Sequence, residues 1–126
     1  MTLSTIVILV LALYLLQLFA QEISRFGFNL KALVGNRDHP PAMSTVAARL
    51  DRARHNMIEA MPFFLGLTML AFASGHAPEA VRGATVFLVA RVLYVPAYAS
   101  GLPWLRSLLW LTGNAGLLLM AFDALS

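Results

Sequence analysis

The sequence predicts an all-α membrane protein built as a bundle of four transmembrane helices. Two observations support this prediction: 60% of the residues are hydrophobic with a mean hydropathy of +0.76, and only 12% are charged. This composition is typical of membrane proteins, and a chain of 126 residues is long enough for one domain. A third observation is that no strand-like alternation of polar and apolar residues and no internal repeat occurs. We therefore expect a single four-helix domain over residues 1–126.

Four segments are long enough to cross a bilayer. A helix rises about 1.5 Å per residue, so about 20 residues span the hydrocarbon of about 30 Å. The segments cover roughly 3–21, 45–74, 78–99 and 104–125. The first contains no charged side chain, and no Lys or Arg precedes Arg25. We interpret it as a retained span, because a signal peptide has a basic start and a shorter apolar run.

The second segment has a charged first half and an apolar second half. Its apolar stretch, 60–74, is too short to cross a bilayer, so the helix must begin earlier. Ser44 or Thr45 can act as its N-cap, directly after a break in the chain at two consecutive prolines. Pro62 lies inside this predicted helix and should bend it.

The ends of the third and fourth segments follow one pattern. Gly75 and Pro78 precede the third segment, and Gly101 and Pro103 precede the fourth. Glycine commonly ends a helix, and proline is tolerated in a first turn because its missing N–H needs no partner there. The third segment contains one charge deep in the bilayer, Arg91.

Lys and Arg are distributed unequally between the two membrane sides. The first loop with the head of the second span, and the third loop, hold most of them: Arg25, Lys31, Arg37, Arg49, Arg52, Arg54 and Arg106. The opposite side holds Arg82 alone. The positive-inside rule predicts that loops one and three are cytoplasmic and that both termini are outside. We expect Arg37 and Arg54 to contact lipid headgroups.

Helical spacing gathers polar residues into two stripes. At about 100° per residue, one stripe lies on the second span and one on the third: Arg49, Arg52, Asn56 and Glu59, then Arg91, Tyr94 and Tyr98. A charge near the bilayer centre costs at least about 2.5 kcal/mol, so Arg91 should face protein or a wet cavity, with Glu59 as its partner. Together with Arg106, the stripes predict a cationic pocket that opens to the cytoplasm and suits a small ligand with carboxylates.

The same pattern also has a purely structural interpretation. An Arg–Glu pair can lock membrane helices together, and arginines at a helix head can extend to lipid phosphates. The spacing alone leaves both interpretations open. His55 and Glu59 are four residues apart, but without a third ligand we favour a solvated histidine over a metal site. The chain has no cysteine, so any thiol must come from a ligand, and its net charge of +3 is too small to indicate nucleic acid.

Two motifs resemble those of a known family. The pattern R-x-x-R-A-x-x-N-x-x-E-x-x-P, residues 49–62, resembles the signature of the MAPEG family, the membrane-associated proteins in eicosanoid and glutathione metabolism. The stretch ARVLYVPAYASGLPWLRS, residues 90–107, is similar to a later motif of that family. The resemblance covers nearly the whole chain and is strongest to the small bacterial branch, which implies a bacterial inner membrane.

The resemblance implies a homotrimer with glutathione bound at each subunit interface. By position, Arg106 would stabilise the glutathione thiolate. The resemblance, together with the two stripes, indicates the following glutathione-binding residues: Arg25, Arg52, Asn56, Glu59, Arg91, Tyr94 and Tyr98. The implied activity is a glutathione-dependent transferase or peroxidase acting on lipophilic electrophiles in the bilayer.

Two other functions are open to such a sequence. One is a non-enzymatic membrane subunit or scaffold that keeps the family fold, because a fold does not guarantee its chemistry. The other is a small four-span drug exporter. Such exporters commonly use an acidic residue in the first span, and the first span here has none.

Overall fold

Four long helices make up the structure, a computed structural model that describes residues 1–27, 29, 31, 34–35, 38 and 42–126. The helices are α1 (Leu3–Phe26), α3 (Thr45–Ser74), α4 (Ala77–Ser100) and α5 (Pro103–Leu125). Each is long and apolar enough to cross a membrane, and the described residues contain no strand. The chain is therefore an all-α membrane protein with a four-helix transmembrane bundle.

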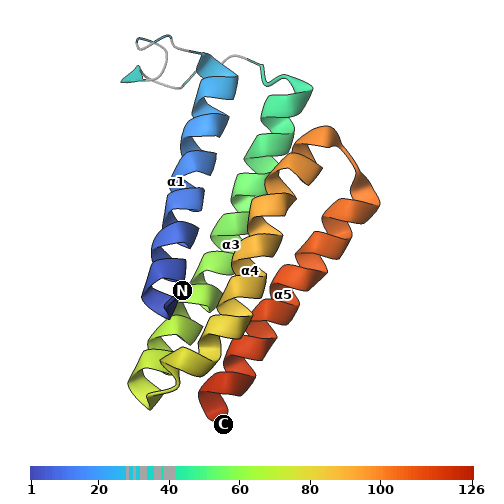
Figure 1. Ribbon diagram of the computed structural model, residues 1–126. Helices are drawn as coiled ribbons and strands as arrows, with labels where there is room; N and C mark the ends of the chain where they lie inside the picture. Colours follow the sequence, from blue (N-terminus) through green and yellow to red (C-terminus); the bar gives the residue numbers. More distant parts are fainter. Residues whose placement is uncertain (28, 30, 32–33, 36–37, 39–41) are drawn as a thin grey trace.

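The helices form an open arrangement with α1 and α5 at its two edges (Figure 1). Both edge helices pack against α3 and α4, and α1 does not contact α5. The first loop and the α4–α5 turn lie at one end of the bundle. The two termini and the α3–α4 turn lie at the other end. The bundle therefore has a first-loop end and a terminal end.

The helix ends have the chemistry that their residues predict. The Ser44 hydroxyl accepts from the backbone N–H of Ala47 at 3.1 Å, and α3 begins at Thr45. Gly75 and Gly101 end α3 and α4 in the left-handed conformation, with φ of 80° and 78°. The first helix continues five residues past its predicted end at 21, because Glu22 and Arg25 leave the apolar run but not the helix.

Aromatic and small residues pack the interior. The rings of Phe64 on α3 and Phe87 on α4 stack, with centroids 4.9 Å apart. Gly83 on α4 and Gly116 on α5 bring two helix backbones together. A Cβ built on Gly83 would lie 2.5 Å from the carbonyl oxygen of Gly116. A second link between α4 and α5 lies at the terminal end, where the exposed Arg82 donates to the buried carboxylate of Asp123 at 2.6 Å.

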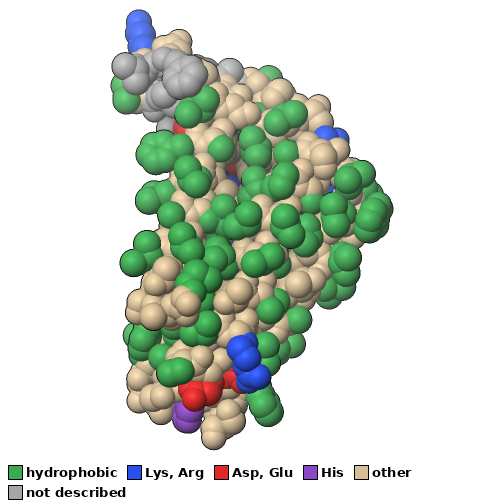
Figure 2. Space-filling view, in the orientation of Figure 1, with side chains coloured by type: hydrophobic (Ala, Val, Ile, Leu, Met, Phe, Trp, Pro, Cys, Tyr) green, Lys and Arg blue, Asp and Glu red, His purple; other side chains and the backbone are tan. Residues whose placement is uncertain are grey.

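Much of the outer surface is apolar. Figure 2 shows hydrophobic side chains along the length of the bundle, with charged side chains near its ends. In the apolar 18-residue window of each candidate span, between 22% and 50% of the residues are buried inside the protomer. The remaining apolar surface is available to lipid or to other subunits.

Candidate functional site

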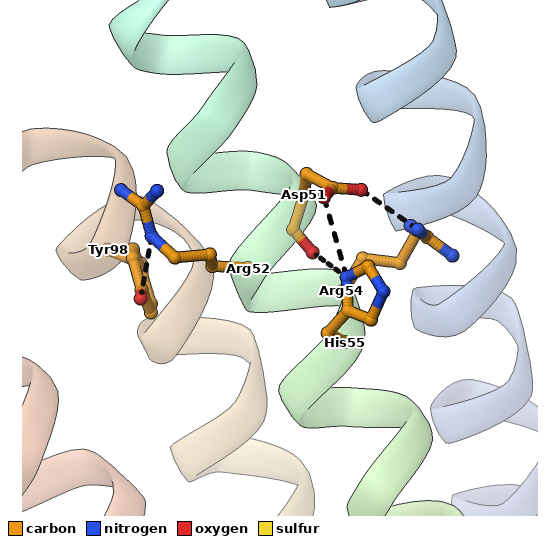
Figure 3. A network of polar contacts seen from close by, with 5 residues as sticks. All are labelled: Asp51, Arg52, Arg54, His55 and Tyr98. Atoms are coloured by element: carbon orange, nitrogen blue, oxygen red, sulfur yellow. Dashed lines mark hydrogen bonds and ion pairs between the residues drawn. The ribbon is translucent and has the colours of Figure 1, made fainter.

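Three helices meet at Tyr98, near the first-loop end of the bundle. The Arg52 Nε on α3 donates to the Tyr98 hydroxyl at 3.2 Å (Figure 3). The Arg106 guanidinium, in the first turn of α5, lies 4.8 Å from the centre of the Tyr98 ring. An arginine near an aromatic face is attracted by the ring's quadrupole. Tyr98 therefore contacts arginines from two other helices.

A pocket opens next to this junction. Tyr94, one turn before Tyr98 on α4, packs edge-to-face against it with centroids 5.5 Å apart. The pocket has a volume of about 310 Å³ and is lined by Tyr94, Arg106, Ser107, Trp110 and Leu111. One wall is therefore cationic and aromatic, and the other is apolar.

Arg91 is buried deeper in the bundle, with 2% of its surface exposed. Its Nη1 donates to the side-chain oxygen of Asn56 at 2.5 Å, and its guanidinium carbon lies 5.1 Å from the ring centre of Phe87. Gly113 on α5 lies beside it, since a Cβ there would be in ordinary van der Waals contact with the Arg91 Nε, at 3.5 Å. That Nε has no hydrogen-bond partner in the described part of the chain.

The predicted ion pair between Arg91 and Glu59 is wrong within the protomer. The Arg91 guanidinium donates to Asn56, and among the described residues no ion pair joins it to Glu59. Helical spacing gives the angle of a residue around its own axis but not the level at which two helices face each other. Here that level sets Arg91 opposite Asn56, one turn before Glu59.

Glu59 nevertheless belongs to the same region. It is exposed and lines a second pocket of about 210 Å³, together with Asn56, Ala60, Phe63, Arg91, Trp110 and Asn114. Trp110 lines both pockets. The two pockets thus adjoin across one indole ring, one beside Arg106 and the other beside Arg91 and Glu59.

The structure gathers all but one of the predicted site residues around the Tyr98 junction and the two pockets. They are Arg52, Asn56, Glu59, Arg91, Tyr94, Tyr98 and Arg106. Arg25 is the exception. It lies in the last turn of α1, its guanidinium carbon is 5.4 Å from the ring centre of Phe26, and α1 does not contact α5. Within one protomer, Arg25 therefore does not meet Arg106.

The sequence prediction missed part of the α5 wall. The predicted site residues did not include Ser107, Trp110 and Asn114. The signal that could have found Trp110 and Asn114 is the helical spacing from Arg106, since positions four and eight residues later return to nearly the same face. That rule was applied to the second and third spans but not to the fourth.

A different polar cluster occupies the other side of α3, facing α1 (Figure 3). Arg54 pairs with Asp51 at 2.8 Å, and each side chain is 20% exposed. A contact of Arg54 with lipid headgroups stays a prediction, and Arg37 lies outside the described residues. His55 lies with its Nδ1 2.9 Å from the backbone oxygen of Asp51. No group of three potential metal ligands occurs among the described residues.

Comparison with known proteins gives one match. A family model described as the MAPEG family matches residues 1–126, the whole chain. No curated protein and no solved structure matches the chain.

Proposed function

The chain belongs to the MAPEG family, and on this basis we propose that it is a glutathione-dependent transferase or peroxidase that acts on lipophilic electrophiles within the membrane. The family in general is associated with glutathione and with reactions of this type. The observation that supports the proposal best is the junction at Tyr98, where Arg52 and Arg106 converge beside a pocket. The chain has no cysteine, so glutathione would supply the thiol nucleophile.

Arg106 is the proposed catalytic residue. It lines the pocket of about 310 Å³ with Tyr94 and Ser107, and its guanidinium offers a planar cation there. A free thiol has a pKa near 8.5, and a neighbouring cation lowers that pKa by stabilising the thiolate. Arg106 would therefore hold the sulfur as thiolate at neutral pH, ready to attack an electrophile.

The second pocket suits the charged ends of the tripeptide. Arg91 lines this pocket, and Arg52 lies one turn before Asn56 on α3. Each would offer a guanidinium group, which binds a carboxylate with two parallel hydrogen bonds. Arg91 retains an unpartnered buried Nε, and Asn56 can offer its amide N–H groups. The exposed carboxylate of Glu59 would accept from the glutathione ammonium. These donors and the single carboxylate thus match a ligand with two carboxylates and one ammonium.

The lipophilic substrate would approach from the bilayer. Trp110 and Leu111 form the apolar wall of the Arg106 pocket, and both are exposed on α5. A ligand dissolved in lipid would reach the thiolate across this wall without passing through water. In the homotrimer that we propose, Arg25 at the α1 edge would reach the site of a neighbouring subunit.

The arginine distribution also supports an orientation. The site lies at the first-loop end, where the Lys and Arg residues concentrate. We propose that this end faces the cytoplasm of a bacterial cell and that the chain resides in the inner membrane, with both termini outside. The site would then open toward the compartment in which glutathione is synthesised.

The test separates binding from thiolate formation. Arg106→Ala should keep most of the glutathione affinity while thiolate formation at neutral pH falls sharply, because the charge beside the sulfur is lost. Arg52→Ala should weaken binding first. Titration calorimetry gives the affinity, and ultraviolet difference absorbance gives the thiolate. Lys31→Ala removes an exposed cation at the same end and serves as the control for net charge.

Two outcomes would overturn the catalytic assignment. One is a wild-type protein that binds no glutathione, and the other is unchanged thiolate formation in Arg106→Ala. Either result would favour a non-enzymatic subunit with the family fold, in which the arginine–tyrosine junction only joins helices.

A further inference from the structure

The C-terminus of α4 receives a cation from another helix. The last carbonyl groups of a helix lack intrahelical partners and carry the negative end of its dipole. The last turn of α4 contains no basic residue. Arg49 on α3 fills this role, because its Nη1 donates to the backbone oxygen of Ala99 at 3.1 Å.

The same guanidinium packs directly on the α4–α5 turn. Gly101 has a φ of 78°, which glycine adopts without strain. A Cβ built there would lie 2.7 Å from the Arg49 Nη2 and 2.8 Å from its Cζ and Nη1. A side chain at position 101 would therefore be strained by this φ and would displace the end of the Arg49 side chain.

This turn connects two residues of the proposed site. The N–H of Gly101 donates to the carbonyl of Tyr98 at 3.1 Å. Leu102, the N-cap residue of α5, provides no side-chain cap, and the N–H of Arg106 donates to its carbonyl at 3.1 Å. A group that holds residues 99–101 in place therefore also restricts the position of Tyr98 before the turn and of Arg106 after it.

We propose that Arg49 is a positioning residue that holds the α4–α5 turn against α3 and so sets the place of Arg106 relative to Tyr98 and Arg52. Its guanidinium is engaged by the protein backbone, and it lines neither site pocket. The sequence stripe grouped it with the ligand-binding arginines, but the structure separates Arg49, on the backbone, from Arg52, on a tyrosine hydroxyl. This inference rests on the proposed function.

The first measurement is the pH dependence of thiolate formation by bound glutathione. Arg49→Met keeps a long side chain but removes the charge and the donor. We expect the midpoint of thiolate formation to rise by about one pH unit, while glutathione affinity changes less than about threefold. Gly101→Ala should give the same pattern, because its Cβ would displace the Arg49 guanidinium.

The matched control is Arg82→Met at the terminal end. Arg82 also joins α4 to another helix, through Asp123, but it lies outside the site. This variant should lose stability without moving the midpoint, which distinguishes a positioning effect from general destabilisation. If Arg49→Met does not fold, Arg49→Lys decides the question. It keeps the charge but not the planar group, so the midpoint should rise by about half a pH unit.

The second measurement does not depend on glutathione. Hydrogen exchange of the amides in residues 101–107 should accelerate in Arg49→Met while exchange in α1 stays unchanged. If the wild type binds no glutathione, the proposed function fails, and this exchange alone decides whether Arg49 holds the turn. Unchanged exchange would overturn the inference. An affinity loss as large as the loss of thiolate would also overturn it, because Arg49 would then bind the ligand itself.

Discussion

Arg91 illustrates how a buried charge can be held without a countercharge. Its hydrogen-bond partner is the neutral amide of Asn56, and its neighbours include the ring faces of Phe87 and Tyr94. Among the described residues, no carboxylate lies within ion-pair distance of it. Placing a positive charge in the membrane interior costs free energy, and such charges usually pair with a partner or bind a ligand. The retained charge therefore favours an anionic ligand in the adjoining pocket.

The Asn56 contact predicts that loss of the Asn56 side chain destabilises the protein more than loss of the Glu59 side chain. Asn56→Ala should lower the free energy of unfolding by about 1.5–3 kcal/mol, because it removes a hydrogen bond to a buried charged group. Glu59→Ala should cost less, since Glu59 is exposed, but it should weaken glutathione binding. Thermal unfolding in detergent measures the first effect and calorimetry the second. A lower melting temperature for Glu59→Ala than for Asn56→Ala would restore the carboxylate as the partner of Arg91.

At the scale of elements, the pairing of α4 with α5 depends on two glycines. A Cβ on Gly116 would lie 2.7 Å from the carbonyl oxygen of Gly83 and 2.8 Å from the backbone nitrogen of Phe87. Small residues let helix backbones approach closely, which is a main source of helix association in lipid. The glycine contact and the contact of Arg49 with the α4–α5 turn thus hold α5 against the rest of the bundle at two different heights along its axis.

Adding one methyl group at this contact should therefore separate the helices. Gly116→Ala should destabilise the protein by about 1–3 kcal/mol, the usual cost of overpacking a close contact. Gly66→Ala is the matched control, because a Cβ at that helical position meets nothing within 4 Å. It should be neutral or gain about 0.5–1 kcal/mol from helix propensity. Equal melting temperatures for the two variants would show that the contact can relax without cost.

The helix limits could be predicted because local chemistry determines them. Ser44 begins α3 and Gly75 and Gly101 end α3 and α4, as capping and backbone conformation require. The polar stripes predicted that Arg52 and Tyr98 would face one another. The level at which two helices meet depends on packing along their whole length, so the sequence did not indicate that Arg91 would contact Asn56. The contact of Arg49 with the Ala99 carbonyl could not be predicted either, since a backbone acceptor leaves no mark in the sequence.

At the scale of the whole molecule, the protomer leaves one face of its site uncovered. α5 contacts α3 and α4 but not α1, and the residues lining the two pockets include the exposed Glu59, Phe63, Trp110 and Leu111. A second subunit could cover this face with its own α1 edge. Arg25, which has no role in the site of its own protomer, lies on that edge.

Assembly should therefore be measurable as a fixed multiple of the 13.7 kDa protomer. We expect a trimer in lipid nanodiscs, by mass analysis that accounts for bound lipid. Arg25→Ala should leave the trimer intact and weaken glutathione binding, because the side chain would contact ligand across the interface. Monomers or dimers alone would contradict the proposed assembly, and unchanged affinity in a trimeric Arg25→Ala would remove Arg25 from the site.

The pairing of Arg82 with Asp123 also bears on how the chain enters the membrane during synthesis. The most apolar window of α4 has the lowest mean hydropathy of the four spans, 1.4, and α4 carries two arginines. Asp123, which offsets one of those charges, lies near the end of α5. A charged residue is poorly accepted by the insertion machinery when its helix is presented alone. We expect α4 to remain beside the translocon until α5 follows, so that the two helices enter the lipid as a hairpin.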